Sequence, residues 1–300
     1  MKRFVLKSIL FLAIMTVIDL CAGNFFQLRE KVKTGTRGRI NHVINNSTDD
    51  VLIMGSSRAL HHYNSRILED SLGLSVYNMG VDANGMILAS GISELTFRRH
   101  EPKLIIFEMT PAYDFVTRGN VDQSKFLHYL KPYYDDPKIR SLVNEVDVLE
   151  GLKMNSSLYR LNSSIVEFLE GIYTDKKLPD RGFMPSEKKL KHEPPISPSE
   201  HNSVDSVKVN LLNSFLGQLK ARGIPIVFTI SPVYCNRSED YNTMKKYLEE
   251  RGYTVLDYLE DPAFVGNKRY FSDGTHLNSL GADTLTSIVA GRLKHLYPNM

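Results

Sequence analysis

Two short polar motifs hold residue types that nucleophilic catalysis requires. The first, Gly55-Ser56-Ser57-Arg58, directly follows the apolar run Val51-Leu52-Ile53-Met54. A serine at a strand-to-helix turn exposes its hydroxyl group, and the N-terminus of the following helix stabilises developing negative charge. The motif is not the Gly-x-Ser-x-Gly elbow, and alone it is equally typical of phosphate loops and plain turns.

The second motif is Asp273-Gly274-Thr275-His276, just before the last predicted helix. An aspartate three residues before a histidine on a tight turn can hold one ring N–H, so that the other ring nitrogen faces a nucleophile. Each motif alone is a weak signal. Together they predict that Ser57 is a nucleophile, His276 its general base and Asp273 the group that orients the imidazole.

The elements that must position these motifs alternate between strand and helix. Short apolar runs, several of them closed by glycine or proline, predict strands at residues 51–54, 75–79, 104–109, 225–230 and 254–257. Helical patterns predict helices at residues 64–72, 85–99, 204–222, 239–251 and 278–296. This alternation predicts an α/β domain whose parallel sheet is covered on both faces, with its active site at the carboxyl ends of the strands.

Residues 112–202 interrupt this alternation and are rich in Tyr, Asn, Ser, Lys and Pro. Helical pieces are predicted near residues 122–130, 137–150 and 156–173, and residues 175–202 show no core-forming period. Insertions of this length are often functional. A surface insertion and a cap that shapes substrate choice are both consistent with the sequence.

The N-terminus carries the pattern of a membrane signal. Lys2, Arg3 and Lys7 precede an apolar run that, with Asp19 as its one charged residue, extends to Phe26. The run is about long enough to cross a bilayer once. We expect a signal anchor at residues 1–26 with its N-terminus in the cytoplasm, a linker at 27–48 and one domain at 49–300. A cleaved signal peptide and a buried helix are the alternatives.

Charge and cysteine content exclude several classes of protein. The net charge of +3 divides into +6 for the first 40 residues and −3 for the remaining 260. A mildly acidic globular part argues against nucleic-acid binding. The two cysteines, Cys21 and Cys235, cannot build a disulfide scaffold. The His61-His62 pair has no further ligand at metal-binding spacing, so we expect no metal and no cofactor.

The two motifs together resemble those of the SGNH hydrolase superfamily, which includes the GDSL esterases. That family has Gly-Asp-Ser or Gly-Ser-Ser after its first strand and Asp-x-x-His near its end, here followed by Leu277-Asn278 and Gly281. The resemblance covers about residues 50–111 and 204–297. It implies a three-layer α/β/α flavodoxin-like sandwich with a five-stranded parallel sheet, and a Ser57–His276–Asp273 triad.

The resemblance also implies an oxyanion hole formed by the backbone N–H groups of Ser57 and Gly80. The third family motif, Gly-x-Asn-Asp, is absent, and Tyr113 stands where the asparagine donor is expected. Tyr113, Thr110 or Asn84 is then the candidate substitute donor. Losing one such donor typically costs about 100- to 1,000-fold in rate.

Three further residues near these motifs are candidates for substrate contact. Arg58 is placed to bind an acidic sugar or phosphate, although an ion pair with Asp82, Glu108 or Asp114 is the favoured interpretation. Asp82 and Thr110 complete the candidate set, and a simple turn explains Asp82 equally well.

The function that these observations favour is ester hydrolysis outside the membrane. A membrane-anchored domain with Gly-Ser-Ser-Arg and a degenerate third motif resembles bacterial proteins linked to acylation of envelope polysaccharides. The expected substrate is an O-acyl, for example O-acetyl, ester of a glycan or a small ester, on the periplasmic side of the inner membrane in a Gram-negative cell. The alternatives are an O-acyltransferase with a membrane acyl-donor partner and a binding or assembly protein that has lost catalysis.

Overall fold

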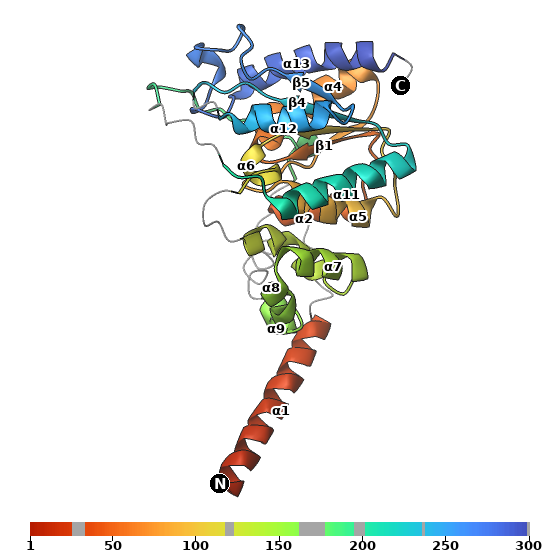
Figure 1. Cartoon of the computed structure of the whole chain (residues 1–300), viewed down its shortest axis with the longest axis vertical. Helices are drawn as coiled ribbons and strands as arrows, with labels where there is room; N and C mark the ends of the chain where they lie inside the picture. The colour runs from red at the N-terminus through yellow and green to blue at the C-terminus, as the bar shows by residue number, and fades with distance from the viewer. Residues whose placement is uncertain (26–33, 118–122, 162–177, 195–201, 236–237, 299–300) are drawn as a thin grey trace. The chain divides into compact units, whose positions relative to one another are not determined.

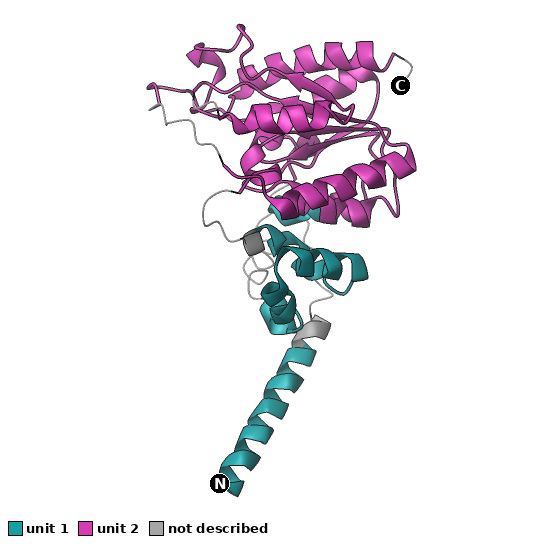
Figure 2. Cartoon of the chain, in the orientation of Figure 1, with its two compact units in different colours: residues 1–41, 123–177 teal, residues 42–122, 178–300 magenta. Residues whose placement is uncertain are grey.

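The computed structural model describes residues 1–25, 34–117, 123–161, 178–194, 202–235 and 238–298. These residues divide into two compact units (Figure 2). Unit 1 comprises residues 1–41 and 123–177, and unit 2 comprises residues 42–122 and 178–300. The predicted helical pieces 122–130 and 156–173 and the predicted linker 27–48 extend in part outside the described residues.

Unit 2 is built on a five-stranded, wholly parallel sheet in the order β2-β1-β3-β4-β5. The strands are β1 (Val51–Gly55), β2 (Val76–Asn78), β3 (Leu104–Glu108), β4 (Ile226–Ile230) and β5 (Thr254–Asp257). Each lies within one residue of its predicted range at either end, and β2 is one residue shorter than predicted at both ends. The strand order reverses between β1 and β3, because β2 is added on one side of β1 and the later strands on the other. Ligands bind at such a switch point in open α/β sheets.

Helices cover both faces of the sheet, as predicted (Figure 1). On one face, α4 (Ser65–Leu72) and α13 (Ser279–Leu296) enclose a core that includes Ile53, Ile106 and Val289. On the other face, α5 (Met86–Thr96) and α11 (Ser206–Arg222) pack together, with the Phe107 and Phe215 rings 6.2 Å apart. The remaining elements of unit 2 are α3 (Ser57–His62), α6 (Pro111–Asp114), η3 (Asp180–Gly182), α12 (Asp240–Glu249) and η4 (Lys268–Tyr270). The three-layer α/β fold is therefore present.

Residues 178–194, the end of the expected insertion, are held against the domain by backbone hydrogen bonds. The Met184 N–H donates to Leu60 O at 3.2 Å, and the Leu190 N–H donates to Phe271 O at 2.9 Å. This return segment therefore contacts both of the elements that carry the two motifs, because Leu60 lies in α3 and Phe271 precedes Asp273.

Unit 1 is helical. Its elements are α1 (Lys2–Phe25), η2 (Gln123–Tyr133), α7 (Pro137–Val146), α8 (Val148–Lys153) and α9 (Ser157–Leu161), and α2 (Gly35–Asn45) begins in unit 1 and ends in unit 2. Helix α2 lies inside the range expected for a linker. Arg37 and Arg39 are each 2% exposed there, so these two charges do not lie in a solvated linker.

Helix α1 is long and apolar enough to cross a membrane, and none of its apolar window is buried in the protein. Phe4 is 75% and Leu12 62% exposed. A membrane anchor and a signal sequence both satisfy this description.

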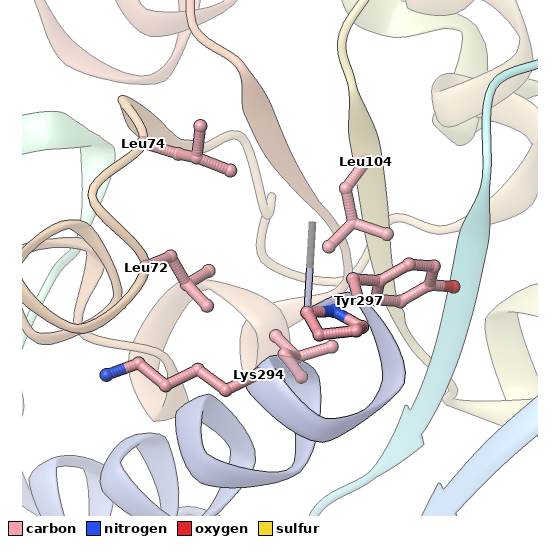
Figure 3. Close-up of a pocket in the computed structure, with 7 residues that line it drawn as sticks. Leu72, Leu74, Leu104, Lys294 and Tyr297 are labelled. Atoms are coloured by element: carbon pink, nitrogen blue, oxygen red, sulfur yellow. The ribbon is translucent and has the colours of Figure 1, made fainter. Parts of the chain in front are cut away.

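A cavity of about 320 Å³ lies at the amino-terminal edge of the sheet (Figure 3). Its lining includes Leu72, Leu74 and Leu104, with Lys294 and Tyr297 from the end of α13. Because Leu104 begins β3, this cavity is at the opposite end of the strands from the two motifs.

At Gly55, the end of β1, the fold depends on the absence of a side chain. Its φ is +134°, and an added Cβ would lie 2.5 Å from Glu108 O. We expect Gly55→Ala to lower the free energy of unfolding by about 1–3 kcal/mol or more, because a clash adds to an unfavourable φ. The measurement is chemical denaturation of the full chain in detergent.

Gly217→Ala is the matched control. Gly217 lies in α11 with no atom within 4 Å of an added Cβ. Alanine there should raise stability by up to about 1 kcal/mol, because glycine is a poor helix former. Equal losses for the two variants would show that the tight approach at Gly55 is not what limits stability.

Candidate active site

Ser57 is placed at the first turn of a helix by a sharp end to the central strand. Gly55 closes β1, Ser56 is the N-cap of α3, and Ser57 is its first residue. Ser56 is fully buried and its Oγ lies 2.7 Å from Thr110 Oγ1. The turn therefore points one serine into the protein and leaves the other, Ser57, partly exposed.

The second motif lies on a tight loop that is closed by hydrogen bonds at its base. Phe271 and Leu277 form an antiparallel bridge. Asn278 follows: its Oδ1 accepts from Gly281 N at 3.0 Å and caps α13, and its Nδ2 donates to Arg269 O and Phe271 O. These bonds give a structural reason for the Leu-Asn-x-x-Gly sequence that follows His276.

The structure brings the three residues of the predicted triad together. Ser57 Oγ lies 2.8 Å from His276 Nε2, and His276 Nδ1 lies 2.9 Å from Asp273 Oδ2. With the carboxylate at Nδ1, that nitrogen carries the proton and Nε2 is free to accept one from Ser57. This is the arrangement that a nucleophile, a general base and an orienting acid require.

Asp273 is fixed by its own turn. Its Oδ1 accepts the backbone N–H groups of Thr275 and His276, each at 2.8 Å. Partial burial acts against ionisation of Asp273, but the hydrogen bonds from the His276 ring and from these two N–H groups hold its pKa well below the usual range. The carboxylate is therefore ionised wherever His276 has to act as a base.

Gly80, the expected second oxyanion donor, has a protein partner. Its N–H donates to Asn78 Oδ1 at 3.0 Å. The Asn78 amide also donates to Ala59 O at 2.7 Å and to Tyr63 O at 3.0 Å, and so ties β2 to α3. An added Cβ at Gly80 would lie 2.4 Å from Leu60 N. Gly80 thus allows a close backbone approach, and an oxyanion would have to share or replace its bond to Asn78.

The loop after β3 is organised by a buried carboxylate. Asp114 accepts from Thr110 N at 2.7 Å and from Met86 N at 2.9 Å. Burial raises the pKa of Asp114 to about 7, against the effect of these two hydrogen bonds. Thr110 is joined to Ser56 as described above, so its hydroxyl group supports the nucleophile turn.

The two remaining candidate donors lie in neighbouring loops. Tyr113 N–H donates to Thr110 O at 2.8 Å. Asn84 is 8% exposed; its Nδ2 donates to Asp82 O at 2.9 Å, and its Oδ1 has no hydrogen-bond partner among the described residues. The two loops approach each other closely at Gly85, where an added Cβ would lie 2.7 Å from Tyr113 Cβ.

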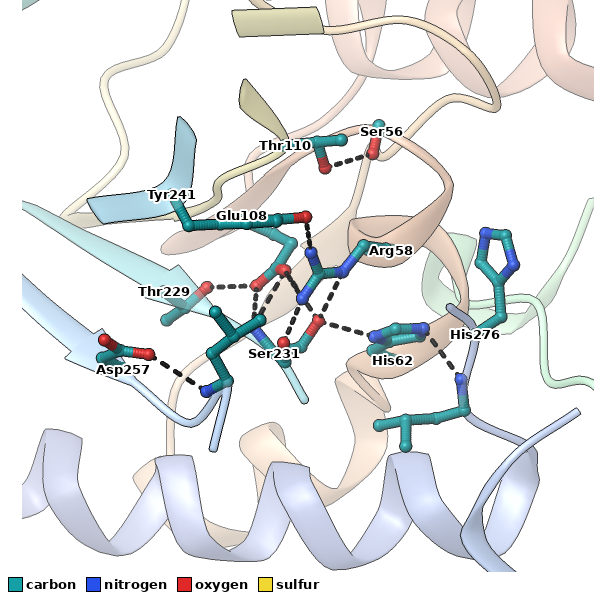
Figure 4. A network of polar contacts seen from close by, with 12 residues as sticks. Ser56, Arg58, His62, Glu108, Thr110, Thr229, Ser231, Tyr241, Asp257 and His276 are labelled. Carbon is teal, nitrogen blue, oxygen red and sulfur yellow. Dashed lines mark hydrogen bonds and ion pairs between the residues drawn. The ribbon is translucent and has the colours of Figure 1, made fainter. Parts of the chain in front are cut away.

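Arg58 is buried next to the nucleophile and is paired within the protein (Figure 4). It is 3% exposed, and its Nη2 lies 3.2 Å from Glu108 Oε1. Its other donors reach Ser231 and the Tyr241 hydroxyl group. The geometry therefore supports the ion pair with Glu108 and leaves this guanidinium without a free donor face for an acidic substrate.

Glu108 is the centre of a fully buried polar network. Its carboxylate accepts from Ser231 N at 3.0 Å, from Ser231 Oγ at 2.6 Å and from Thr229 Oγ1 at 2.8 Å, and also from the Tyr63 hydroxyl group. The sequence pattern indicates a possible ion pair for Glu108 and no role for Ser231. A charged residue inside the apolar run 104–109 was the available signal, because a buried charge requires partners.

His62 connects this network to the loop that carries His276. Its Nδ1 lies 2.7 Å from Ser231 Oγ, and its Nε2 accepts the Leu277 N–H at 3.0 Å. Burial, together with the neighbouring charge of Arg58, lowers the pKa of His62 well below its usual value. A neutral His62 with its proton on Nδ1 satisfies both contacts.

The adjacent His61 makes different contacts. Its Nδ1 lies 2.6 Å from Met184 O in the return segment, and its Nε2 lies 3.3 Å from Asp82 Oδ1. Asp82, a candidate substrate contact, is 65% exposed. Within the described ranges, no three His, Cys, Asp or Glu side chains form a group that could hold a metal ion.

No protein-family model matches the chain, and no curated protein matches it. Solved structures with a similar chain path include a proposed lipolytic protein of the G-D-S-L family from Desulfitobacterium hafniense DCB-2, with 11% identity, a TM-score of 0.41, and coverage of 81% of this chain and 98% of that chain. A proposed acylhydrolase from Bacteroides fragilis NCTC 9343 has 12% identity, a TM-score of 0.41, and coverage of 84% and 89%.

A proposed platelet activating factor from Streptococcus pneumonia has 14% identity, a TM-score of 0.43, and coverage of 93% of this chain and 98% of that chain. Similarity at this level carries no information about activity or substrate. The chemistry of the site rests on its geometry.

The buried Arg58–Glu108 pair can be tested by a double-mutant cycle. We expect Glu108→Gln and Arg58→Met each to lower the free energy of unfolding by about 3–5 kcal/mol, because each leaves a buried group without its partner. The double variant should lose less than the sum of the two. The measurement is denaturant unfolding of the full chain in detergent.

Glu250→Gln is the control, because Glu250 and Lys246 form an exposed pair at 3.9 Å. That change should cost less than about 1 kcal/mol. Strictly additive losses in the cycle would contradict an energetic coupling between Arg58 and Glu108.

Proposed function

We propose that the chain is an extracytoplasmic serine esterase that removes O-acyl groups from an envelope glycan. The observation that carries this proposal is the contact of Ser57 Oγ with His276 Nε2 at 2.8 Å, with Asp273 on the other ring nitrogen. A serine hydroxyl group next to an imidazole base, with a carboxylate that orients the imidazole on its other side, is suited to acyl transfer.

In the proposed reaction, His276 Nε2 takes the Ser57 proton as Oγ attacks the ester carbonyl carbon. The bond from that carbon to the alcohol oxygen then breaks, and His276 returns the proton to the leaving alcohol. Water, deprotonated by His276, attacks the acyl-enzyme and releases the carboxylic acid and Ser57. Asp273 stabilises the imidazolium form, and the Ser57 N–H at the start of α3 supplies an oxyanion donor.

A cavity close to the loop that carries His276 has several basic side chains in its lining. A cavity of about 460 Å³ borders Asn278 and Ser279, two and three residues after His276. Its lining includes Lys188, Lys189, Lys268 and Arg269, with Glu187 as the anionic residue. Because Ser57, Asp273 and His276 are not among its lining residues, we propose this cavity as a contact for acidic or hydroxyl groups of the glycan and not for the acyl group.

The proposed location follows from helix α1. Its N-terminal basic residues Lys2 and Arg3 favour a cytoplasmic N-terminus. With α1 retained as an anchor, the chain after it lies outside the cytoplasm.

We expect Ser57→Ala to abolish hydrolysis of a chromogenic acetyl ester and covalent labelling by a fluorophosphonate probe. Ser56→Ala should retain labelling, because Ser56 Oγ is buried against Thr110. Mass spectrometry of the labelled peptide identifies the modified serine. Hydrolysis that survives Ser57→Ala would overturn the mechanism, whereas transfer to an added oligosaccharide in excess of hydrolysis would identify a transferase.

Asp273→Asn should lower kcat by about 100- to 10,000-fold with little change in KM, because the amide cannot hold the ring and stabilise its charge as a carboxylate does. Asp261→Asn, in an exposed turn after β5, is the control and should leave both constants unchanged. A KM effect of the same size would place Asp273 in substrate binding instead.

A further inference from the structure

Helix α8 carries an exposed apolar face. Val148 is 64%, Leu149 66% and Leu152 64% exposed, whereas Glu150 on the same helix is 2% exposed. Lys131 and Lys153 neutralise the Glu150 carboxylate at 3.1 and 3.3 Å, and the Tyr159 hydroxyl group donates to it at 2.6 Å. The helix therefore presents an apolar side to its surroundings and keeps its acidic side chain turned into unit 1.

The helix that follows is tied to α1 by a partly buried contact. Asp19 of α1 accepts from Ser156 Oγ at 2.7 Å, from Ser157 N at 3.0 Å and from Leu158 N at 2.8 Å. Asp19 thus caps the first turn of α9, which begins four residues after α8 ends. The charged residue that interrupts the apolar run has a structural role in unit 1, and this favours a retained α1 over a cleaved one.

The position of Asp19 along α1 sets the level of α8 and α9 relative to a bilayer. From Phe4 to Ile18 the helix rises about 22 Å at about 1.5 Å per residue. The hydrocarbon core of a bilayer is about 30 Å thick. With Lys2 and Arg3 at one headgroup layer, Asp19 lies near the opposite boundary, and the exposed face of α8 lies close to it.

We propose that α8 docks on the outer leaflet of the bilayer that α1 crosses, with Val148, Leu149 and Leu152 inserted at the boundary between headgroups and acyl chains. The occupant of this apolar face is lipid. The proposal rests on α1 being the retained anchor of the proposed function, and it adds a second membrane contact. A short apolar face at this level reaches about 5–10 Å into the boundary.

The chain contains no tryptophan, so a single introduced tryptophan reports on one position. In the full-length chain reconstituted into phosphatidylcholine–phosphatidylglycerol vesicles, Leu149→Trp should show blue-shifted emission and be quenched by lipids brominated on their acyl chains. Leu12→Trp is the reference inside α1, and Glu250→Trp, 59% exposed in unit 2, is the reference for aqueous iodide quenching.

Bromolipid quenching of Leu149→Trp that is at least about two-fold stronger than bromolipid quenching of Glu250→Trp supports the proposal, given the expected depth of insertion. Quenching of Leu12→Trp without quenching of Leu149→Trp overturns it while leaving the anchor in place. A blue shift at position 149 without bromolipid quenching identifies a protein occupant, such as a second copy, and also overturns it. Absence of bromolipid quenching at both positions 12 and 149 would contradict α1 as a membrane anchor and, with it, the proposal.

A second variant tests the link through Asp19. Asp19→Ala in the Leu149→Trp chain should reduce bromolipid quenching at position 149, because α9 loses its cap. The same change in the Leu12→Trp chain should leave quenching there unchanged. Ester hydrolysis on the same vesicles reads out the triad separately, so that loss of docking and loss of the proposed activity are distinguishable.

Discussion

The buried carboxylate of Glu108 is the constraint on which the catalytic end of the sheet depends. A charge at the end of a central strand, with 0% exposure, is tolerated only when every lone pair has a partner. The partners come from α3 and the residue after it, through Arg58 and Tyr63, and from β4 and the residue after it, through Thr229 and Ser231. One charge thereby holds together the ends of β3 and β4 and the helix that begins with Ser57.

The same network reaches both halves of the proposed catalytic machinery. Arg58 directly follows Ser57. His62, in the same short helix, accepts a hydrogen bond at Nε2 from the N–H of Leu277, the residue after His276. Helix α3 therefore sets the position of the nucleophile at its start and of the histidine loop near its end. Because these supports are buried and their contacts satisfied, the Ser57–His276 geometry is set before substrate binds, which is what preorganised catalysis requires.

The sequence was informative where the deciding signal is local. The apolar runs that became β1, β3 and β4, and the two motifs that contain Ser57 and Asp273-x-x-His276, could each be predicted because their residues lie within a few positions of each other. That Ser57 meets His276, 219 positions away, was implied by the family resemblance and by no local pattern. The contact of His62 with Leu277 joins residues 215 positions apart, and no local pattern specifies it. Helix α2 was missed for a related reason: Arg37 and Arg39 resemble a solvated linker, and only tertiary packing buries them.

In a chain without the Gly-x-Asn-Asp motif, the contacts of Asn78 decide how much the Gly80 N–H can stabilise an oxyanion. Its amide makes three bonds, to Ala59, Tyr63 and Gly80, so that the asparagine stabilises the approach of α3 to β2 from the side where the oxyanion hole is expected. In forming a hydrogen bond to an oxyanion, the Gly80 N–H would replace the neutral Asn78 Oδ1 with a charged acceptor. Charge-assisted hydrogen bonds are about twice as strong as neutral ones. The net stabilisation from Gly80 is then the difference between two bonds. In such a site the Ser57 N–H at the start of α3 carries the larger share, and its aim is set by the same helix that Glu108 anchors.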